Sequence, residues 1–516
     1  MNKSGVYLRF YSFRYVMVIQ FRVLIILALG SLLLMEGALA QYASQVVMGK
    51  VFLDRNRNNQ LDAFERGLNK VWVSNGDTIV QTNKKGEYLI RVKKGQILFP
   101  ILPSKYTYAD GKNWWHIVAD SVSNNFSYDF GLIKQKTKKE FKFLAIGDIQ
   151  VGDTTELLQA SNSVLKELTN RNDYDFSIYL GDLVNDEPIL FKPLNRMIQE
   201  IDRPAWLVYG NHDRDFNATK VEQSNLFNMH FGPDTYAFFR NEVLFITLNS
   251  IKPIGKYGYE GVYTKDQLRF LRSMVLKVSK DYPIVISQHI PFVGMKNKDE
   301  VLQILNDYSK VLFLSGHTHT VFQNYINTPA GNTIHELTVG AVSGNWWTGQ
   351  KSWEGIPLSL MQCGTPRGYF EIDFKKGSYK LKYKGVDLPE EKQLSIWSGE
   401  YNGEPTSFLS KSNEFYVNFF SGSNRTSVAM KFQEYPLQYL DKVQKMDPFV
   451  AFIRRSQSEQ KSPDGHSRRA PYLRKPSRHL WKGKLPENLE PGIYKVDILV
   501  QDPKIKDFQQ SIWLWK

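Results

Sequence analysis

Five short polar motifs lie in the middle of this 516-residue sequence, and each contains side chains that could bind a cation. Every motif follows an apolar run typical of a buried strand, and most of them place a glycine beside an aspartate, asparagine or histidine. Glycine permits a sharp backbone turn, so that the next side chain can face a cleft. In chain order the motifs are Gly147–Gln150, Gly181–Asp186, Gly210–Asp213, Gln288–Pro291 and Ser315–His319.

The side chains in these motifs are carboxylates, imidazoles and amides. This mixed set of ligands suits Mn, Fe, Zn or Co rather than Ca, which prefers oxygen ligands alone. A metal held there would lower the pKa of a bound water, so that hydroxide exists near neutral pH. The motifs therefore predict a hydrolytic metal site and no covalent nucleophile.

The segment from Phe141 to about Val386 alternates between apolar strands and runs with helical spacing. This alternation predicts a layered α/β fold. In such folds ligands gather at the carboxyl ends of the strands, which would bring the motifs together. The clearest predicted strands are 143–146, 176–180, 206–209 and 284–287.

The order of the motifs resembles the calcineurin-like metallophosphoesterases, whose pattern is Asp-x-His, Gly-Asp, Gly-Asn-His-Asp/Glu, His and Gly-His-x-His. The resemblance covers the middle ~250 residues, which is near the size of one large domain. Each element alone would be a weak signal, but five in order at strand ends are specific. The resemblance implies a four-layer αββα core over residues 137–386, flanked by an N-terminal and a C-terminal β-sandwich domain.

The resemblance also implies a role for each motif residue. His212 would stand beside the scissile group as general acid or transition-state stabiliser. Two divalent transition metal ions ~3.5–4 Å apart can clamp the attacking and leaving oxygens of an in-line displacement. The implied reaction is hydrolysis of phosphate mono- or diesters by a metal-bound hydroxide. One metal would take Asp148, Gln150 and His319, the other Asn211, His289 and His317, and Asp182 would bridge them.

Gln150 departs from the pattern, since the family usually has histidine there. A neutral, hard carbonyl should bind its metal more weakly or favour Mn or Mg. The departure leaves an alternative open, a non-catalytic envelope- or glycan-binding protein on a degenerate phosphoesterase core. The other seven positions match, which favours the enzyme. Asp186 and Asp213 flank motif residues and are expected to orient His212 or a loop.

A glycine-rich, aromatic segment follows the last histidine motif. Its tryptophans could belong to the core, or they could form a substrate wall that stacks a sugar or a base. An arginine further along could contact a substrate phosphate. The residues of this predicted wall are Trp346, Trp347, Trp353 and Arg367.

Residues 41–136 contain short alternating runs between Gly, Asn and Lys turns, which predict a small antiparallel β-sandwich. Within it, oxygen-bearing side chains have the spacing of a twelve-residue calcium loop, with Asn59 in place of the usual glycine. The alternative is an Asn-rich solvated turn. The segment also resembles B-type repeats of bacterial surface adhesins, and the whole arrangement resembles Bacteroidetes phosphoesterases with accessory domains. The residues of the predicted structural calcium site are Asp54, Asn56, Asn58, Gln60, Asp62 and Glu65.

Residues 387–516 show strand-like runs and no dominant helix, which predicts a second β-sandwich. Much of the net charge of +14 lies in the segment 454–484, which has ten Lys or Arg residues and two acidic ones. This segment could bind an anionic envelope surface, although its Pro, Ser and Gly content is also typical of a solvated loop. We find no recognisable nucleic-acid-binding module and expect a monomer that acts on a small-molecule, glycan or lipid-linked phosphate ester.

Residues 1–40 have the order of a secretory signal peptide, with basic residues, an apolar run from Val23 to Met35, and Ala38-Leu39-Ala40. The alternative is an uncleaved anchor, but the apolar run is shorter than the ~20 residues that a membrane span needs. The single cysteine, Cys363, excludes an intrachain disulfide and a thiolate metal cluster. These features predict an exported protein of the periplasm or bacterial cell surface.

Overall fold

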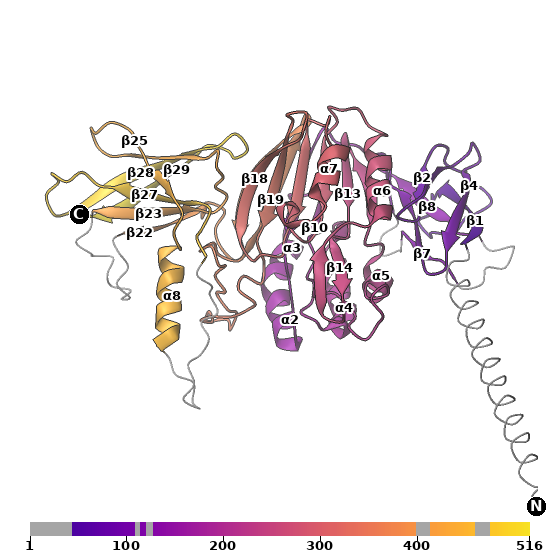
Figure 1. The fold of residues 1–516 in the computed structure, drawn as a ribbon, viewed down its shortest axis with the longest axis horizontal. Helices are drawn as coiled ribbons and strands as arrows, with labels where there is room; N and C mark the ends of the chain where they lie inside the picture. The colour runs from indigo at the N-terminus through magenta and orange to yellow at the C-terminus, as the bar shows by residue number, and fades with distance from the viewer. Residues whose placement is uncertain (1–43, 109–113, 120–126, 399–412, 460–474) are drawn as a thin grey trace, which may run out of the picture.

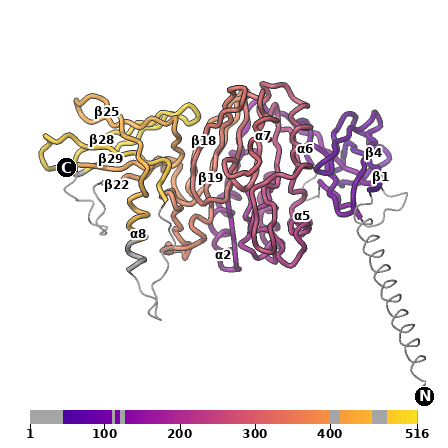
Figure 2. Tube along the Cα trace, in the orientation of Figure 1, coloured from indigo at the N-terminus to yellow at the C-terminus, as the bar shows by residue number. Residues whose placement is uncertain are grey.

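The computed structural model describes residues 44–108, 114–119, 127–398, 413–459 and 475–516. An α/β core lies in the middle of the molecule, with one β-rich domain at each end (Figures 1 and 2). The predicted signal peptide lies outside the described residues. Within the described ranges, the helices are too short or too polar to cross a bilayer.

Two β-sheets form the centre of the core. In the first, of order β11-β10-β9-β20-β21, the strands β9 to β11 are parallel and β20 is antiparallel to β9. In the second, of order β12-β13-β16-β17-β19-β18, the four inner strands are parallel. The bounds of the first sheet are β9 Glu140–Ile146, β10 Phe176–Tyr179, β11 Ala205–Leu207, β20 Gly368–Lys375 and β21 Ser378–Gly385. Those of the second are β12 Tyr236–Arg240, β13 Val243–Thr247, β16 Ile284–Ser287, β17 Val311–Ser315, β18 Val321–Asn327 and β19 Thr333–Val339.

The two sheets pack face to face through aromatic side chains. Phe143 of β9 and Phe176 of β10 each lie with their ring centroids 5.5 Å from that of Phe245 on β13. Such edge-to-face pairs add to the hydrophobic burial between the sheets.

Helices cover the outer faces of both sheets, so the predicted αββα layering is confirmed (Figure 1). The helices α2 and α3, joined by one π-helical turn, pack on the first sheet, where the hydroxyl of Tyr369 on β20 donates to Glu167 of α3. The helices α6 and α7 connect strands of the second sheet on the opposite side. The bounds are α2 Thr154–Ala160, η1 Ser161–Leu165, α3 Lys166–Thr169, η2 Pro188–Leu190, α4 Phe191–Gln199, α5 Asn225–Phe231, α6 Lys265–Val275, η3 Phe292–Gly294 and α7 Lys298–Ile304.

The N-terminal domain consists of two four-stranded sheets, β4-β1-β8-β6 and β3-β2-β5-β7. The expectation of a purely antiparallel sandwich is wrong in one respect, because β1 pairs with β8 in parallel. The bounds are β1 Ser44–Leu53, β2 Trp72–Ser74, β3 Ile79–Gln81, β4 Glu87–Lys93, β5 Ile97–Ile101, β6 Tyr106–Thr107, β7 His116–Ile117 and β8 Phe130–Lys134.

The C-terminal domain also contains two four-stranded sheets, β22-β23-β27-β26 and β25-β24-β28-β29, and all their described pairs are antiparallel. It carries one helix that the sequence pattern did not indicate, α8 (Pro448–Glu459), which projects below the sheets in Figure 1. The bounds of the strands are β22 Leu394–Ser398, β23 Glu414–Phe419, β24 Ser427–Lys431, β25 Gln438–Tyr439, β26 Asp441–Val443, β27 Leu480–Lys484, β28 Ile493–Gln501 and β29 Phe508–Trp515.

Candidate metal centre

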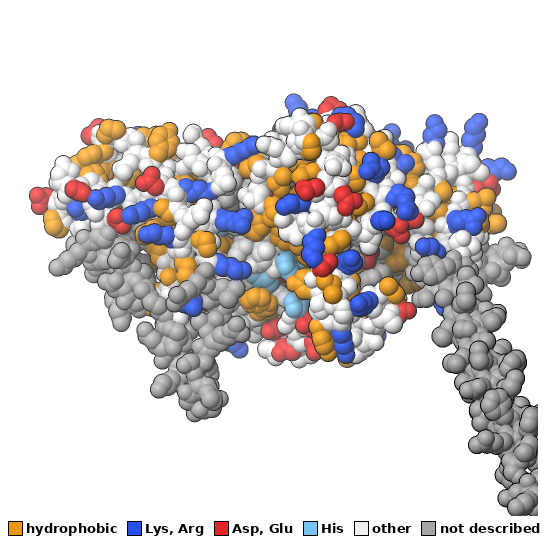
Figure 3. All heavy atoms as spheres, in the orientation of Figure 1, with side chains coloured by type: hydrophobic (Ala, Val, Ile, Leu, Met, Phe, Trp, Pro, Cys, Tyr) orange, Lys and Arg blue, Asp and Glu red, His pale blue; other side chains and the backbone are white. Residues whose placement is uncertain are grey.

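The five polar motifs meet at one edge of the two core sheets, where the parallel strands end. Asp148 and Gln150 follow β9, Asp182 follows β10, and Asn211 follows β11. His289 follows β16, and the last two histidines follow β17. Histidine side chains are visible on the surface of the core in Figure 3. His212, at the edge described here, has a side chain that is 30% exposed, so the edge is open to solvent there.

His289 lies at the centre of one half of the site. Its Nε2 atom is 3.1 Å from Asp182 Oδ2, 3.1 Å from Asn211 Oδ1 and 3.2 Å from His317 Nδ1. Its Nδ1 atom is 2.8 Å from the carbonyl oxygen of Leu180, a contact that places the ring proton on Nδ1. Four potential ligand atoms therefore converge, which is the arrangement expected of a divalent-cation site. Asp182, His289 and His317 also satisfy the distance expected of ligands to one metal ion.

The other half of the site contains Asp148, Gln150 and His319. The ring of His319 donates from Nδ1 to the carbonyl of Gly344 at 2.6 Å, which leaves Nε2 facing Asp148 Oδ1 at 4.0 Å. The carbonyl oxygen of the Gln150 side chain is buried without a hydrogen-bond partner. Such an orphaned oxygen costs free energy unless a cation or a proton satisfies it. The residues present thus fit a divalent metal.

Burial and charge shift the pKa values of the site residues in opposite directions. Burial raises the pKa of Asp148 well above its usual range, and the nearby Asp182 adds to this. Burial opposes protonation of His289, but the Asp182 carboxylate outweighs it and raises the pKa of this imidazole to about 9. Burial and the neighbouring His289 lower the pKa of His317 to about 3, and burial lowers that of His319 to about 4. Two imidazoles are thus held neutral, as metal ligands must be.

Five of the predicted ligands adopt a left-handed backbone conformation, which non-glycine residues rarely do. Each such residue costs roughly 1–2 kcal/mol, and strain of this kind is typical of functional sites. The values of φ are 41° at Asp148, 47° at Gln150, 47° at Asp182, 73° at His317 and 49° at His319.

Two of the motif glycines are required for space rather than for a turn. A Cβ atom on Gly316 would lie 2.4 Å from Asp148 Oδ2, and one on Gly210 would lie 2.3 Å from Asp182 Oδ1. Contacts this short do not occur, so any side chain at either position would displace a ligand carboxylate. The predicted sharp turn applies at Gly181, whose φ is 88°.

His212 lies beside the metal residues and is partly exposed. Its backbone N–H donates to Asp182 Oδ1 at 2.8 Å, and its ring Nδ1 is 2.8 Å from Asp186 Oδ1. Asp213 has a different role, because its buried carboxylate accepts the backbone N–H groups of Leu183 and Val184 and that of Gly210. Asp186 therefore orients the imidazole, while Asp213 joins two of the motif loops, a distinction that spacing alone could not make.

Sequence reasoning missed Arg214, which follows the third motif directly. Its buried guanidinium donates to the carbonyl of Asn211 and to those of Tyr257 and Gly258. The last two belong to a hairpin formed by β14 (Ile251–Ile254) and β15 (Gly258–Gly261). The ring of Tyr259, on this hairpin, lies edge-on to His317 with centroids 6.0 Å apart. The position of Arg214 directly after a ligand motif was a sequence signal that could have indicated its role. No sequence signal indicated that the hairpin lies beside the site.

The four residues of the predicted substrate wall lie in different environments, and the role of the tryptophans stays a prediction. Trp346 lies parallel to the ring of His319, with centroids 4.3 Å apart, and is 40% exposed. Trp347 is buried and donates its indole N–H to the carbonyl of Ile149, while Trp353 is 96% exposed. The prediction for Arg367 is wrong, because its buried guanidinium pairs with Asp387 at 2.6 Å and cannot reach a substrate phosphate.

The predicted calcium loop is a compact, self-bonded turn. The carboxylates of Asp54 and Glu65 are buried and accept backbone N–H groups of the loop itself. The side-chain amides of Asn56 and Asn58 both donate to Asp62 Oδ2. Gln60 is exposed, and its backbone N–H donates to the Asn58 side chain. The residues therefore converge, and calcium binding stays a prediction.

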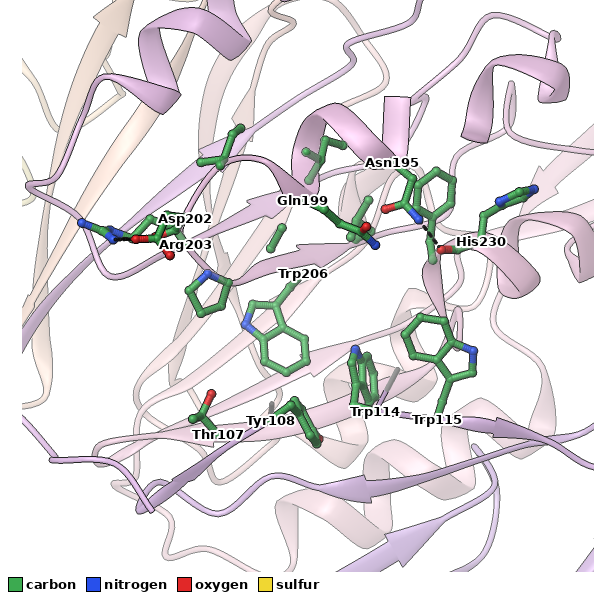
Figure 4. Close-up of a pocket in the computed structure, with 16 residues that line it drawn as sticks. Thr107, Tyr108, Trp114, Trp115, Asn195, Gln199, Asp202, Arg203, Trp206 and His230 are labelled. Atoms are coloured by element: carbon green, nitrogen blue, oxygen red, sulfur yellow. Dashed lines mark hydrogen bonds and ion pairs between the residues drawn. The ribbon is translucent and has the colours of Figure 1, made fainter. Parts of the chain in front are cut away.

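A cavity of about 250 Å³ lies at the junction of the N-terminal domain and the core, away from the predicted site residues (Figure 4). Its wall includes Tyr108 and Trp114, which stack with centroids 5.4 Å apart, and Trp206 of β11. Trp114 and Trp206 also meet edge to face at 5.4 Å. These rings join the two domains, and no metal-site residue lines the cavity.

The chain matches two models of one protein family. Residues 141–321 match the calcineurin-like phosphoesterase domain, and residues 336–508 match the C-terminal region of calcineurin-like phosphoesterases. A probable cyclic nucleotide phosphodiesterase of Ruthia magnifica subsp. Calyptogena magnifica is 23% identical over 192 residues, which are 34% of this chain and 77% of that protein.

Two solved structures are similar in part. The purple acid phosphatase PPD1 of yellow lupin seeds has 12% identity and a TM-score of 0.34, over 66% of this chain and 71% of that one. PhoD has 10% identity and a TM-score of 0.34, over 73% of this chain and 83% of that one. The two family models, which together span most of residues 141–508, give the assignment. The chain belongs to the calcineurin-like phosphoesterase family.

Proposed function

We propose that this protein is a dinuclear metal-dependent phosphoesterase that hydrolyses phosphate mono- or diesters. The observation that carries the proposal is a cluster of potential ligand atoms around His289, with Asp148 close to it. Asp182, Asn211 and His317 each place one such atom within 3.2 Å of His289 Nε2. The group around Asp148, with the orphaned Gln150 oxygen, lies next to them.

Two divalent transition metal ions, of Mn, Fe or Zn, would supply the charge that holds a phosphate and activates a water when they are bound. The chain itself contributes the fixed geometry. His289 and His319 each have one ring nitrogen bonded to a backbone carbonyl, which orients the other nitrogen toward the site. Asp182 contacts both His289 and the backbone N–H of His212, so this carboxylate, which would bridge the two ions, also positions the proposed acid.

His212 is the proposed proton donor to the leaving oxygen. Its Nδ1 atom is engaged by Asp186, so its Nε2–H is the group available to a substrate. Burial alone would lower the pKa of His212, but the hydrogen bond to Asp186 and the charge of Asp182 raise it above the ordinary value. Both interactions favour the protonated, donating form of the imidazole.

The substrate class is narrowed by what surrounds the site. The partly exposed ring of Trp346 offers a flat apolar surface beside His319. A ring-bearing alcohol, such as a sugar or a nucleoside, would suit that surface. The relative from Ruthia magnifica is named a probable cyclic nucleotide phosphodiesterase, which adds cyclic diesters to the substrates to be tested.

We further propose that the protein is exported to the periplasm or the cell surface and acts as a monomer. Support comes from the leader pattern of residues 1–40 and from the basic segment 454–484, which would favour an anionic envelope surface. Residues 1–40, and residues 460–474 of the basic segment, lie outside the described residues. Cell fractionation with an antibody to the C-terminal domain tests the location, since the full-length chain in the cytoplasm would contradict it.

The enzymatic proposal is tested by turnover of p-nitrophenyl phosphate and bis-p-nitrophenyl phosphate with Mn²⁺ added. Asp182→Ala is expected to abolish both turnover and Mn²⁺ binding. His212→Ala should lower kcat by about 10²–10⁴-fold while Mn²⁺ binding persists. His230→Ala, a histidine outside the motifs, serves as the matched control. Absence of turnover by a wild-type protein fully loaded with Mn²⁺ would contradict the proposal and favour the non-catalytic alternative.

A further inference from the structure

The loop between β19 and β20, residues 340–367, contacts the predicted metal ligands through its N-terminal part. The carbonyl of Gly344 accepts the ring N–H of His319 at 2.6 Å, and this contact orients His319. Ser343 N–H donates to the carbonyl of Asp148 at 3.1 Å, and Trp346 covers the His319 ring. The position of one predicted ligand thus depends on this β19–β20 loop.

Hydrogen bonds inside the β19–β20 loop connect its first end to its last. The Gln362 side chain donates to Asn345 Oδ1 at 2.7 Å, and the Gln362 backbone N–H donates to the carbonyl of His319 at 3.3 Å. Asn345 N–H bonds Ser359 Oγ, which in turn donates to the carbonyl of Ser343. A displacement at Cys363 would therefore be passed to Gly344.

The C-terminal part of the β19–β20 loop is hydrogen-bonded to the C-terminal domain. Asn418 of β23 donates from Nδ2 to the carbonyl of Cys363 at 2.9 Å and to Asp447 Oδ2 at 2.8 Å. His479 contacts Asn418 Oδ1 at 2.7 Å through Nδ1. A Cβ atom on Gly364 would lie 2.3 Å from Asp447 Cγ, so the loop backbone rests directly on this carboxyl.

All three C-terminal residues of this contact are buried and hydrogen-bonded. Asp447 also accepts the backbone N–H groups of Phe449 and Val450, at the start of α8. Buried polar networks of this kind fix one arrangement of the groups they join, because an unmade bond there is costly. The network therefore places the loop in one position.

We propose that Asn418 is a positioning residue for His319, so that the C-terminal domain orients a ligand of the metal centre through the β19–β20 loop. This inference rests on the proposed metal centre. Groups that orient metal ligands typically change metal affinity by about 10–100-fold when they are removed. The C-terminal domain is then a working part of the active site and not an independent binding module.

The test is a calorimetric titration of the full chain with Mn²⁺ alone, without substrate. Asn418→Leu keeps the size of the side chain and removes its hydrogen bonds. We expect one of two bound Mn²⁺ ions to bind about 10–100-fold more weakly and the other to be unchanged. Gln362→Met breaks the same connection within the loop, and it should weaken the same ion even if Asn418→Leu does not fold. Thermal unfolding in EDTA establishes that each variant is folded.

Two further variants make the result specific. Asn418→Leu should weaken binding of the same Mn²⁺ ion that His319→Ala weakens. The double variant Asn418→Leu with His319→Ala should lose little more Mn²⁺ affinity than His319→Ala alone, because both changes act on one ligand. Gln323→Met is the matched control, since Gln323 donates to the carbonyl of Ser421 across the same domain junction but outside the loop. It should leave both affinities unchanged.

The possible results separate the two hypotheses. Wild-type Mn²⁺ affinities in folded Asn418→Leu and Gln362→Met would overturn the positioning role while the proposed function stands. An equal loss in Gln323→Met would also overturn it, since the effect would then belong to the junction as a whole. A wild-type chain that binds no Mn²⁺ would overturn the proposed function, and the inference with it.

Discussion

Two histidines of the site share a feature that Gln150 lacks. His289 and His319 each bond a backbone carbonyl with one ring nitrogen, which fixes the direction of the other. Gln150 has only a long contact of 3.5 Å from its Nε2 to Asn185 Oδ1, and its Oε1 has no protein partner. Its metal should therefore be held less tightly than a histidine at this position would hold it.

Replacing Gln150 by histidine tests this difference. We expect Gln150→His to raise the affinity for Zn²⁺ relative to Mn²⁺ by about tenfold, because an imidazole is the softer ligand. Competition between the two ions, followed by metal analysis of the dialysed protein, measures the ratio. Gln150→Glu is the control for charge. A ratio unchanged in Gln150→His would mean that residue 150 does not contact metal.

Asp186 provides a second test at a single residue. Asp186→Asn keeps the shape of the side chain but removes the charge that favours protonated His212. We expect kcat to fall by about 10–100-fold, because a general acid contributes up to 10⁴-fold and its orientation is part of that. Mn²⁺ binding should persist. An unchanged kcat at saturating substrate would show that His212 works without this partner.

The residue types of the site could be predicted from sequence, but their conformations could not. The motifs identify Asp148, Asp182 and the histidines because metal binding demands those side chains. The left-handed backbone at five of them is set by packing and leaves no compositional signal. Arg367 shows the same limit, because nothing near it in sequence indicates that Asp387 takes its charge.

At the scale of elements, Arg214 holds the β14–β15 hairpin against the third ligand motif. The fork of its guanidinium reaches three carbonyls, on Asn211, Tyr257 and Gly258. A lysine has a single ammonium group and cannot reproduce this geometry. The hairpin should therefore loosen when Arg214 is replaced by lysine.

We expect Arg214→Lys to lower kcat/KM by about tenfold or more, since small displacements near the reacting groups are costly. Trypsin should also cut faster after Lys256, which lies between the two strands of the hairpin. Both effects are measured on the full chain. Arg196→Lys, at a highly exposed position on α4, is the control. If Arg214→Lys had the same kcat/KM and the same rate of trypsin cleavage as this control, Arg214 would not be what holds the hairpin in place.

The strands that carry the motifs were predictable as elements, and their partners were not. The predicted strand 284–287 has the bounds of β16, and 143–146 lies within β9. The apolar pattern suffices there because parallel central strands are buried on both faces. The pairing of β9 with β20 joins residues more than 200 positions apart, and α8 has only twelve residues. No local pattern specifies either of these.

At the scale of the whole molecule, the core and the C-terminal domain meet at a second polar contact, around His335. Its ring lies parallel to that of Tyr325, and its Nδ1 is 2.5 Å from the hydroxyl of Tyr379. The C-terminal domain places Arg425 over Tyr325 at 3.7 Å and Lys504 over Tyr379 at 4.0 Å. Burial, Lys504 and Arg425 together lower the pKa of His335 to about 3.

This contact predicts that acid weakens the fold. His335 is protonated near pH 6.5 in the unfolded chain but only near pH 3 in the folded one, so stability present above pH 6.5 is lost as the pH falls below it. Between pH 7 and pH 5 this one group should cost about 2 kcal/mol. Urea unfolding in EDTA at both pH values, compared between the wild type and His335→Gln, measures the difference. An equal loss in both proteins would contradict the assignment.

The place of β20 in the first sheet has a consequence for synthesis. Strand β9 carries the first metal motif, and its neighbour β20 leaves the ribosome roughly 220 residues later, which at 5–20 residues per second is about 10–45 s. Through that interval one edge of the strand beneath Asp148 has no partner. The proposed metal centre is therefore among the last parts of the core to be completed, because the sheet that carries Asp148 lacks β20 and β21 until then. We expect a nascent chain to gain the proposed activity only after most of its length has been made.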